Sequence, residues 1–192
     1  MKLIRENLDG QHVALELITE EHREALRPEV NHQDIWTYAT LSGYGDGFDV
    51  WFDDAKKHND EGRDFTYIVR DKASNRLVGS TRYTSIFADH NRLEIGYTWY
   101  IPEFWGGVVN PNCKLLLFNL AFERMGANRV ELKANNDNKR SLAAMKKAGA
   151  VFEGVMRHHM VNADGTLRDS AIFSIIKPDW PQAKAGLLAR LS

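Results

Sequence analysis

Apolar and polar residues alternate in short segments along this chain, and a two-residue period is typical of half-buried β-strands. The clearest alternation covers His12–Ile18, with the sequence HVALELI. Further strand-like segments are predicted at Phe65–Arg70, Leu77–Phe87, Leu93–Ile101, Arg129–Ala134, Val151–Val161 and Thr166–Ile176. The last two are joined through Asp164-Gly165, a strong hairpin signal, so we expect them to pair.

Between these strands the apolar residues recur at helical spacing. One amphipathic helix is predicted from the apolar set Phe48, Trp51, Phe52 and Ala55, which has charged residues opposite it. A second helix, after Asn110, is apolar on two sides and is expected to be buried and to stop at Gly126. A third runs from Asn138 to Gly149, and Thr19 is the candidate N-cap of a helix after the first strand.

The resulting order of elements is β-α-α-β-β-β-α-β-α-β-β. It predicts an α/β (α+β) structure with a βαβ crossover that joins the strands near 93–101 and 129–134. The length of 192 residues suits one domain, spanning residues 1–192. No internal repeat or linker divides the chain.

Composition narrows the class of protein. The net charge of −1 creates no global field that would recruit nucleic acid or an anionic membrane. Charged residues interrupt the N-terminal MKLIRENLDG, so it is not a signal peptide, and no apolar run approaches the length of a membrane span. The single cysteine, Cys113, cannot form an internal disulfide. We therefore expect a cytoplasmic protein with no nucleic-acid or membrane partner.

Three features are candidates for chemistry, and the first is the glycine turn Gly106-Gly107. It lies between a predicted strand and the start of a buried helix, where free N–H groups and the helix dipole attract anions. We interpret Gly106–Asn112 as a site for a phosphate-bearing ligand. A tight turn without a ligand is the alternative, and Pro111, near the first helical position, fits either interpretation.

The second candidate is the start of the helix at Asn138, where Ser141 falls at the third helical position. The alternative is that both residues only cap the helix. The third is Glu94, for which the alternative is a solvated carboxylate. Strict alternation places Arg92, Glu94, Gly96, Thr98 and Tyr100 on one face of their strand, opposite Leu93, Ile95, Tyr97 and Trp99.

Taken together, the three features resemble the GNAT superfamily of acyl-CoA-dependent N-acetyltransferases. The motifs that carry the resemblance are EIGYTWYIPEFWGG, then NCKLLL and AFE, then RVELK and NNDNKRSLAAMKKAGAVFEG. The closer likeness is to the RimJ/RimL-like branch, the ribosomal-protein-alanine N-acetyltransferases and their relatives. The resemblance implies a single-domain GNAT-like fold, with a central mixed, mostly antiparallel, twisted sheet flanked by helices.

The resemblance also implies roles for individual residues. The backbone amides of the glycine turn would hold the CoA pyrophosphate, and Asn138 would lie near the pantetheine arm. Trp105 stands where the family usually has Gln or Arg, and Val108 where it usually has Gly or Ala. The implied cofactor-binding set is Trp99, Tyr100, Ile101, Trp105, Gly106, Gly107, Val108, Val109, Asn110, Asn138 and Ser141.

The reaction would move an acetyl group from acetyl-CoA to a primary amine. An amine must be neutral to attack, and Glu94 is the candidate base that takes its proton. Backbone N–H groups around Trp99–Ile101 would stabilise the oxyanion if that strand separates from its neighbour. Met145 stands where many members carry a tyrosine acid, so Ser141 is the candidate substitute.

By default the acceptor is a protein N-terminal α-amine. The alternatives are a small-molecule amine and a non-catalytic acyl-CoA-binding module. Candidate acceptor-site residues are Trp36, Tyr38, His90 and His159. His158 and His159 are adjacent on a strand and face opposite ways, and we expect no metal. The oligomeric state is expected to be a monomer or a homodimer.

Overall fold

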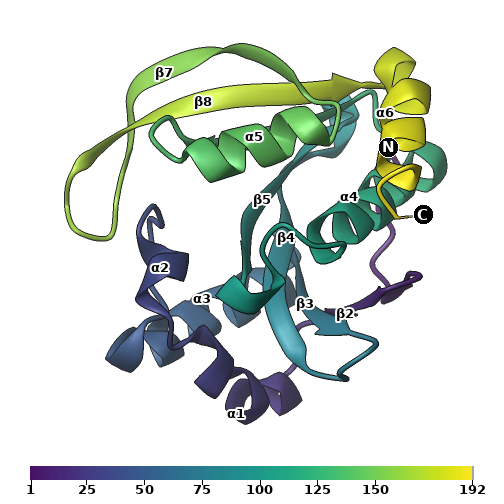
Figure 1. Ribbon diagram of the computed structural model, residues 1–192. Helices are drawn as coiled ribbons and strands as arrows, with labels where there is room; N and C mark the ends of the chain where they lie inside the picture. Colours follow the sequence, from purple (N-terminus) through teal and green to yellow (C-terminus); the bar gives the residue numbers. More distant parts are fainter. Residues whose placement is uncertain (192) are drawn as a thin grey trace.

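The computed structural model describes residues 1–191 and contains one sheet of eight strands in the order β1-β2-β3-β4-β5-β6-β8-β7 (Figure 1). All neighbours are antiparallel except β5 and β6. The mixed, mostly antiparallel sheet and its single crossover are therefore confirmed. The strands are β1 Leu8–Asp9, β2 Val13–Leu17, β3 Phe65–Asp71, β4 Leu77–Phe87, β5 Arg92–Tyr100, β6 Arg129–Asn135, β7 Val151–Val161 and β8 Leu167–Ile176.

Helices cover both faces of the sheet. On β4, Arg82 points to Asp54 of one helix, while the next residue, Tyr83, donates a hydrogen bond to the Leu117 carbonyl of another. Because neighbouring strand residues face opposite ways, these two helices lie on opposite faces. The helices are α1 Arg23–Leu26, α2 Gln33–Trp36, α3 Phe48–Asp60, α4 Val109–Asn119, α5 Lys139–Lys147 and α6 Trp180–Leu188.

Several helix signals are confirmed and a few details differ. Thr19 caps the first helical turns, although these break into the short pieces 20–22 and 23–26. The helix α4 starts at Val109, so Pro111 lies in its first turn, and a π-helical segment, Leu120–Met125, continues it to Gly126. Gly126 has φ +78°, a left-handed conformation that favours glycine at a helix end. The short β1 and the helix α6 were not predicted.

The predicted alternation along β5 is wrong beyond Gly96, because the strand contains a β-bulge. Tyr97 has φ +49°, and the pairing with β4 shifts between Ser80 and Arg82, so two β5 residues oppose one β4 residue. Trp99 packs its ring against Trp36 and Trp51 on the α3 side. Tyr100 instead reaches Asn110 of α4. The bulge thus exchanges the faces predicted for Trp99 and Tyr100.

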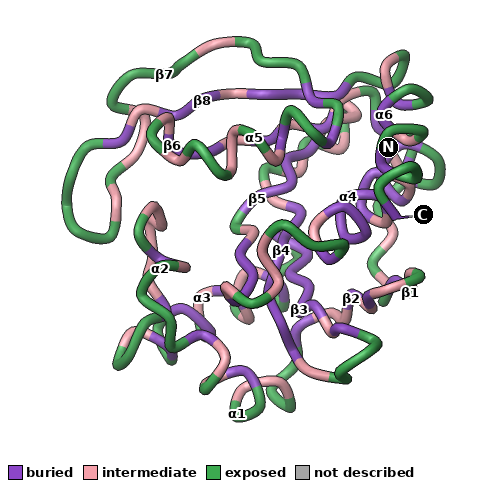
Figure 2. Tube along the Cα trace, viewed as in Figure 1, coloured by how far each residue is buried: buried purple, intermediate pink, exposed green. Residues whose placement is uncertain are grey.

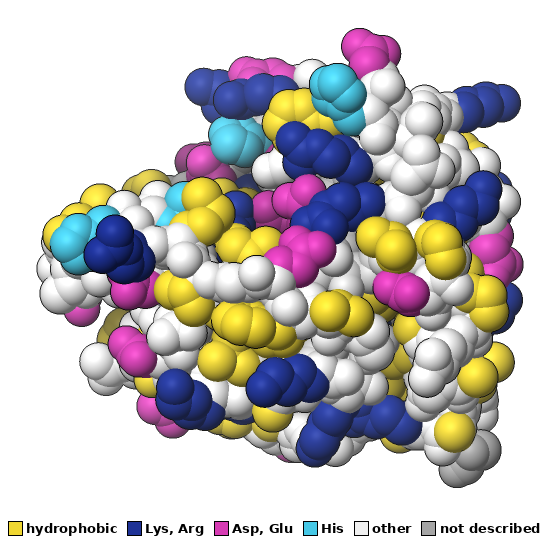
Figure 3. Space-filling model, turned by 90° about the horizontal axis from the view of Figure 1, so that it is seen from above, with side chains coloured by type: hydrophobic (Ala, Val, Ile, Leu, Met, Phe, Trp, Pro, Cys, Tyr) yellow, Lys and Arg dark blue, Asp and Glu magenta, His cyan; other side chains and the backbone are white. Residues whose placement is uncertain are grey.

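The core lies between the sheet and the helices, and the outer strand β7 is mostly exposed (Figure 2). Acidic and basic side chains are interspersed on the face seen in Figure 3. Within residues 1–191, no helix is both long and apolar enough to span a bilayer.

Candidate active site

The strands β5 and β6 pair only through Arg92–Glu94 and Arg129–Glu131, so β5 has no partner on that side beyond Glu94. Two cavities open beside this separation. The turn cavity is lined by Tyr100, Trp105, Gly106, Asn110, Lys114, Arg140 and Met145, among others. The Glu94 cavity is lined by Trp36, Tyr38, Thr84, Glu94, Asn135 and Arg168, among others.

The two cavities share part of their walls. Thr98 and Trp99 of β5 line both, and so do Lys133, Asn138 and Ser141. A molecule in one cavity therefore lies next to a molecule in the other, with the separated strands between them.

The glycine turn forms one end of the turn cavity. Gly106 has φ +80°, and a side chain at Gly107 would meet only the Phe104 carbonyl, at 3.7 Å. The turn is therefore open, and the first N–H groups of α4 have no acceptor within the helix. Val108 has φ −79°, which valine adopts without strain.

Trp105 connects this turn to its surroundings. Its indole N–H donates to the Tyr100 carbonyl at 2.7 Å, and the Arg140 guanidinium lies 3.4 Å from its ring centroid. Trp105 thus holds the turn between the end of β5 and the start of α5. This contact gives tryptophan a structural role at a position where the sequence comparison leads one to expect Gln or Arg.

The predicted cofactor residues at the end of β5, and Ile101 directly after it, differ in whether they face a cavity. Trp99 lines both cavities, and the Tyr100 hydroxyl donates to Asn110 at 3.2 Å. The Ile101 N–H donates to the Val78 carbonyl at 2.9 Å, so it is not available to an oxyanion. Gly107 of the turn and the two valines after it, Val108 and Val109, line neither cavity.

Asn138 caps α5 as predicted, since its side-chain oxygen accepts a hydrogen bond from the Ser141 N–H at 3.0 Å. The cap also orients both residues toward the shared wall of the cavities. A capping role and a binding role are therefore compatible here.

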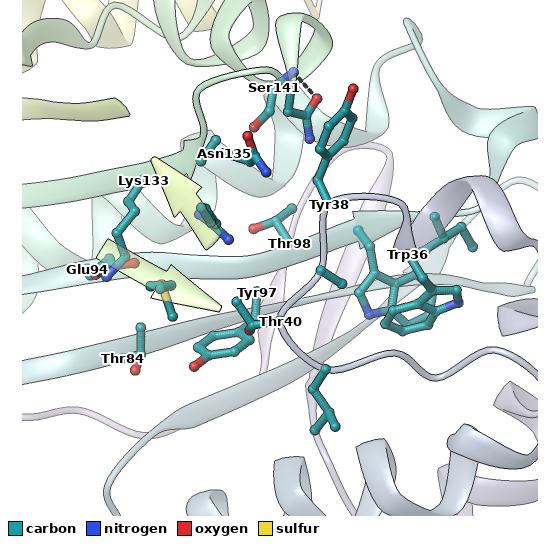
Figure 4. Close-up of a pocket in the computed structure, with 18 of the residues that line it drawn as sticks. Trp36, Tyr38, Thr40, Thr84, Glu94, Tyr97, Thr98, Lys133, Asn135 and Ser141 are labelled. Atoms are coloured by element: carbon teal, nitrogen blue, oxygen red, sulfur yellow. Dashed lines mark hydrogen bonds and ion pairs between the residues drawn. The ribbon is translucent and has the colours of Figure 1, made fainter. Parts of the chain in front are cut away.

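Glu94 is not a solvated carboxylate, because only 5% of it is exposed. Its carboxylate pairs with the Lys133 ammonium at 2.9 Å, and Thr84 lies opposite it on β4 (Figure 4). Burial raises the pKa of Glu94, while the Lys133 charge opposes that rise. The result is a nearly buried carboxylate on the wall of the cavity, poised to accept a proton at higher pH than an exposed glutamate.

Two buried cations in these cavities were not identified from the sequence. Lys114 lines the turn cavity with its Nζ 3.4 Å from the Thr98 hydroxyl, and burial lowers its pKa to about 8. The sequence did contain a signal for Lys114, because a lysine stands there among the apolar residues of α4. Arg168 lines the Glu94 cavity, and nothing in the pattern of its strand distinguishes it from a surface arginine.

Of the four predicted acceptor-site residues, Trp36 and Tyr38 line the Glu94 cavity and the two histidines do not. His90 is exposed in the turn Ala88–His90. His159 lines neither cavity, although burial together with Lys133 and Arg168 lowers its pKa. Among residues 1–191, no group of three His, Cys, Asp or Glu side chains is arranged to hold a metal ion.

A family described as "Acetyltransferase (GNAT) domain" matches residues 12–151. The chain belongs to the GNAT acetyltransferase family. A curated relative, "Putative ribosomal N-acetyltransferase YdaF" of Bacillus subtilis (strain 168), is 32% identical over 109 residues, which is 56% of this chain and 58% of that protein. The match therefore spans less than two thirds of the relative's length.

Solved structures share the fold over the whole chain. A GCN5-related N-acetyltransferase from Brucella melitensis is 27% identical with a TM-score of 0.92, and the match covers 100% of this chain and 88% of that one. Mycobacterium smegmatis RimJ, solved in complex with CoA-disulfide, is 16% identical with a TM-score of 0.81, over 96% and 94% of the two chains. At that identity the likeness to RimJ shows the fold alone.

A GNAT domain uses acetyl-CoA, and the turn cavity of this GNAT domain has the chemistry to hold it. The turn presents open backbone beside Gly106, the start of α4 favours phosphate groups, and the cavity continues along β5 to Thr98. The Glu94 cavity presents one nearly buried carboxylate beside the shared wall.

Proposed function

We propose that this protein transfers the acetyl group of acetyl-CoA directly to a primary amine. The observation that carries this proposal is the shared wall of the two cavities at Thr98, Trp99 and Lys133. A thioester in the turn cavity and an amine in the Glu94 cavity would meet there, without a covalent intermediate on the protein.

On the donor side, the turn Trp105–Asn110 would hold the pyrophosphate through its backbone, and Asn138 would lie beside the pantetheine arm. The unpaired side of β5 beyond Glu94 supports this arrangement, because its backbone groups have no strand to bond with. Lys114 adds a positive charge at the inner end of the cavity.

On the acceptor side, Glu94 would take a proton from the ammonium form of the amine, directly or through one water. The neutral nitrogen then attacks the thioester carbonyl, the carbon–sulfur bond breaks and an amide forms. The departing thiolate needs little help, because a thiol has a pKa of about 8.5. Ser141, on the shared wall, would supply a proton to it and take in its place the second proton that the nitrogen loses as the amide forms.

The default acceptor is a protein N-terminal α-amine, which the name of the Bacillus subtilis relative supports. One observation favours a small-molecule amine instead. The turn of the β7–β8 hairpin reaches the segment after α2, where the Ala163 N–H donates to the Ala39 carbonyl at 2.9 Å. Ala39 lines the Glu94 cavity, so this bridge restricts the passage of a polypeptide into it.

The test is a thiol-release assay with acetyl-CoA against a panel of N-terminal peptides and small primary amines, with acetyl-CoA binding measured in parallel. We expect binding together with amine-dependent release of CoA. Binding without turnover of any amine would favour the non-catalytic acyl-CoA-binding module. A protein that does not bind acetyl-CoA would contradict both functions.

A further inference from the structure

Arg168 is a buried cation that forms no ion pair with a carboxylate of residues 1–191. Only 8% of it is exposed, its backbone pairs with Met160 of β7, and its side chain makes no hydrogen bond or ion pair with any residue from 1 to 191. Its Nε atom is fully buried and unpaired. The other buried arginine in that range, Arg82, lies 3.3 Å from Asp54 and 3.4 Å from Asp64.

A guanidinium without a partner is costly to bury, so arginines in protein interiors usually face a carboxylate or a phosphate. Burial accordingly lowers the pKa of Arg168, and the charge of Glu94 opposes part of that fall. Glu94 is the one carboxylate that lines the same cavity, but it pairs with Lys133 at 2.9 Å. The cavity wall therefore carries two cations and a single anion.

This imbalance bears on which acceptors fit the cavity. An amine without an anionic group enters as an ammonium ion and places another positive charge beside the two cations of the wall. An acceptor that also carries an anion neutralises Arg168 while its amine approaches Glu94. The planar guanidinium binds a carboxylate through two parallel N–H donors, which orients the acceptor as well as attracting it.

We propose that Arg168 binds a carboxylate of the acceptor, so that the substrate is an amine with a carboxylate a few bonds away. This inference rests on the proposed function and specifies its substrate class. Two sources supply this chemistry: a free amino acid, and a peptide whose first residue is Asp or Glu. In both, Glu94 faces the amine and Arg168 faces the carboxylate.

The test compares acceptors that differ in one carboxylate, at saturating acetyl-CoA. One pair is alanine and its α-amide, alaninamide, and the other is a peptide beginning with Asp and the same peptide beginning with Asn. We expect kcat/KM to favour the carboxylate member of at least one pair by about tenfold or more. The pair that shows the preference identifies the source.

The variant Arg168→Met should abolish this preference, mainly by raising KM for the carboxylate acceptor, and Arg168→Lys should retain part of it. The matched control is Arg157→Met, which removes the same charge from an exposed position on β7 and should keep the preference. Thermal unfolding identifies a folding defect, because Arg168→Met removes an unpaired buried charge and should not lower the melting temperature.

Each outcome has a distinct meaning. Turnover of neutral amines with no preference for a carboxylate overturns the role of Arg168 and leaves the proposed function intact. A preference that survives in Arg168→Met overturns that role as well. Absence of turnover with every amine overturns the proposed function and this inference with it.

Discussion

At the scale of single residues, the chemistry depends on charged groups that the fold has removed from water. Glu94 and Lys133 form an ion pair, whereas Lys114 and Arg168 form none with any carboxylate of residues 1–191 and interact with Glu94 only at longer range. A buried charge without a partner destabilises the folded protein, and proteins tend to keep such charges where a ligand completes the pairing.

The substitution Glu94→Gln removes the candidate base and should lower kcat/KM by about a hundredfold or more near pH 7. The affinity for acetyl-CoA should not change. Because burial raises the Glu94 pKa, wild-type activity should fall with decreasing pH earlier than for an exposed glutamate. Rates from pH 5 to 9 check this, with Glu21→Gln as the control, since Glu21 is exposed and lines neither cavity. Wild-type rates in Glu94→Gln would exclude Glu94 as the base.

The substitution Lys114→Met should stabilise the free protein below pH 8. Burial lowers the Lys114 pKa from 10.5 to about 8, so the folded protein bears a cost of roughly 3 kcal/mol at pH 7. That cost disappears between pH 8 and 10.5, where the folded state has lost the proton and the unfolded state still binds it.

The stabilising effect of Lys114→Met should therefore shrink as the pH rises, which urea unfolding at pH 7, 9 and 10 measures. The exposed Lys147→Met serves as the control and should show no such trend. An effect of the same size at every pH would mean that Lys114 is not desolvated.

At the scale of elements, the bulge in β5 and the glycine turn after it decide which groups line the cavities. One extra residue at Tyr97 turns Trp99 toward α3 and Tyr100 toward α4. The ring of Tyr97 lies over the Arg82 guanidinium, whose carbon is 4.3 Å from the ring centroid, and this contact stabilises the left-handed residue. A bulge beside a separated strand is a typical device for re-aiming side chains at a site.

The substitution Gly107→Val tests the turn as the pyrophosphate site. The added side chain has room in the free protein, so stability should change little, but it would occupy the space beside the backbone that the phosphates need. We expect the dissociation constant for CoA to rise about tenfold or more, measured by calorimetry. The control is Gly186→Val on α6, where an added side chain has nothing within 4 Å. Unchanged affinity in a folded Gly107→Val would place the phosphate site elsewhere.

At the scale of the whole molecule, the sheet consists of two parts joined by a short parallel pairing. Strands β1 to β5 continue into β6, β8 and β7 through only three residue pairs. The turn cavity draws its wall from both parts, with Tyr100 and Lys114 on one side and Leu132 and Ser141 on the other. A ligand in this cavity therefore connects the two parts.

CoA should raise the melting temperature of the protein. A hundredfold excess over the dissociation constant contributes about 2.7 kcal/mol, which corresponds to roughly 5–10 °C for a chain of this size. Hydrogen exchange should slow in residues 95–100 of β5 and also in residues 138–141 of α5. Protection of one part alone would contradict a ligand that bridges both.

Much of the fold was predictable from local pattern. The two-residue period located the strands to within a residue or two, because a half-buried strand repeats its apolar face regardless of its neighbours. The helix start at Asn138 and the helix end at Gly126 were predictable for a similar reason, since each residue satisfies backbone groups within one turn of its own helix. The short helices between residues 20 and 47 carried too little periodicity to be placed.

The sequence by itself determined the strands, the main helices, the glycine turn and the likeness to the GNAT family, because each depends on residues close together in the chain. Only the tertiary structure decided that Glu94 is buried, that Trp99 and Tyr100 exchange faces, and that His90 lies away from the site. It also brought Arg168 to the cavity of Glu94. Those facts depend on a bulge and on strands distant in the sequence, whose side chains acquire their charge environment only after the sheet has formed.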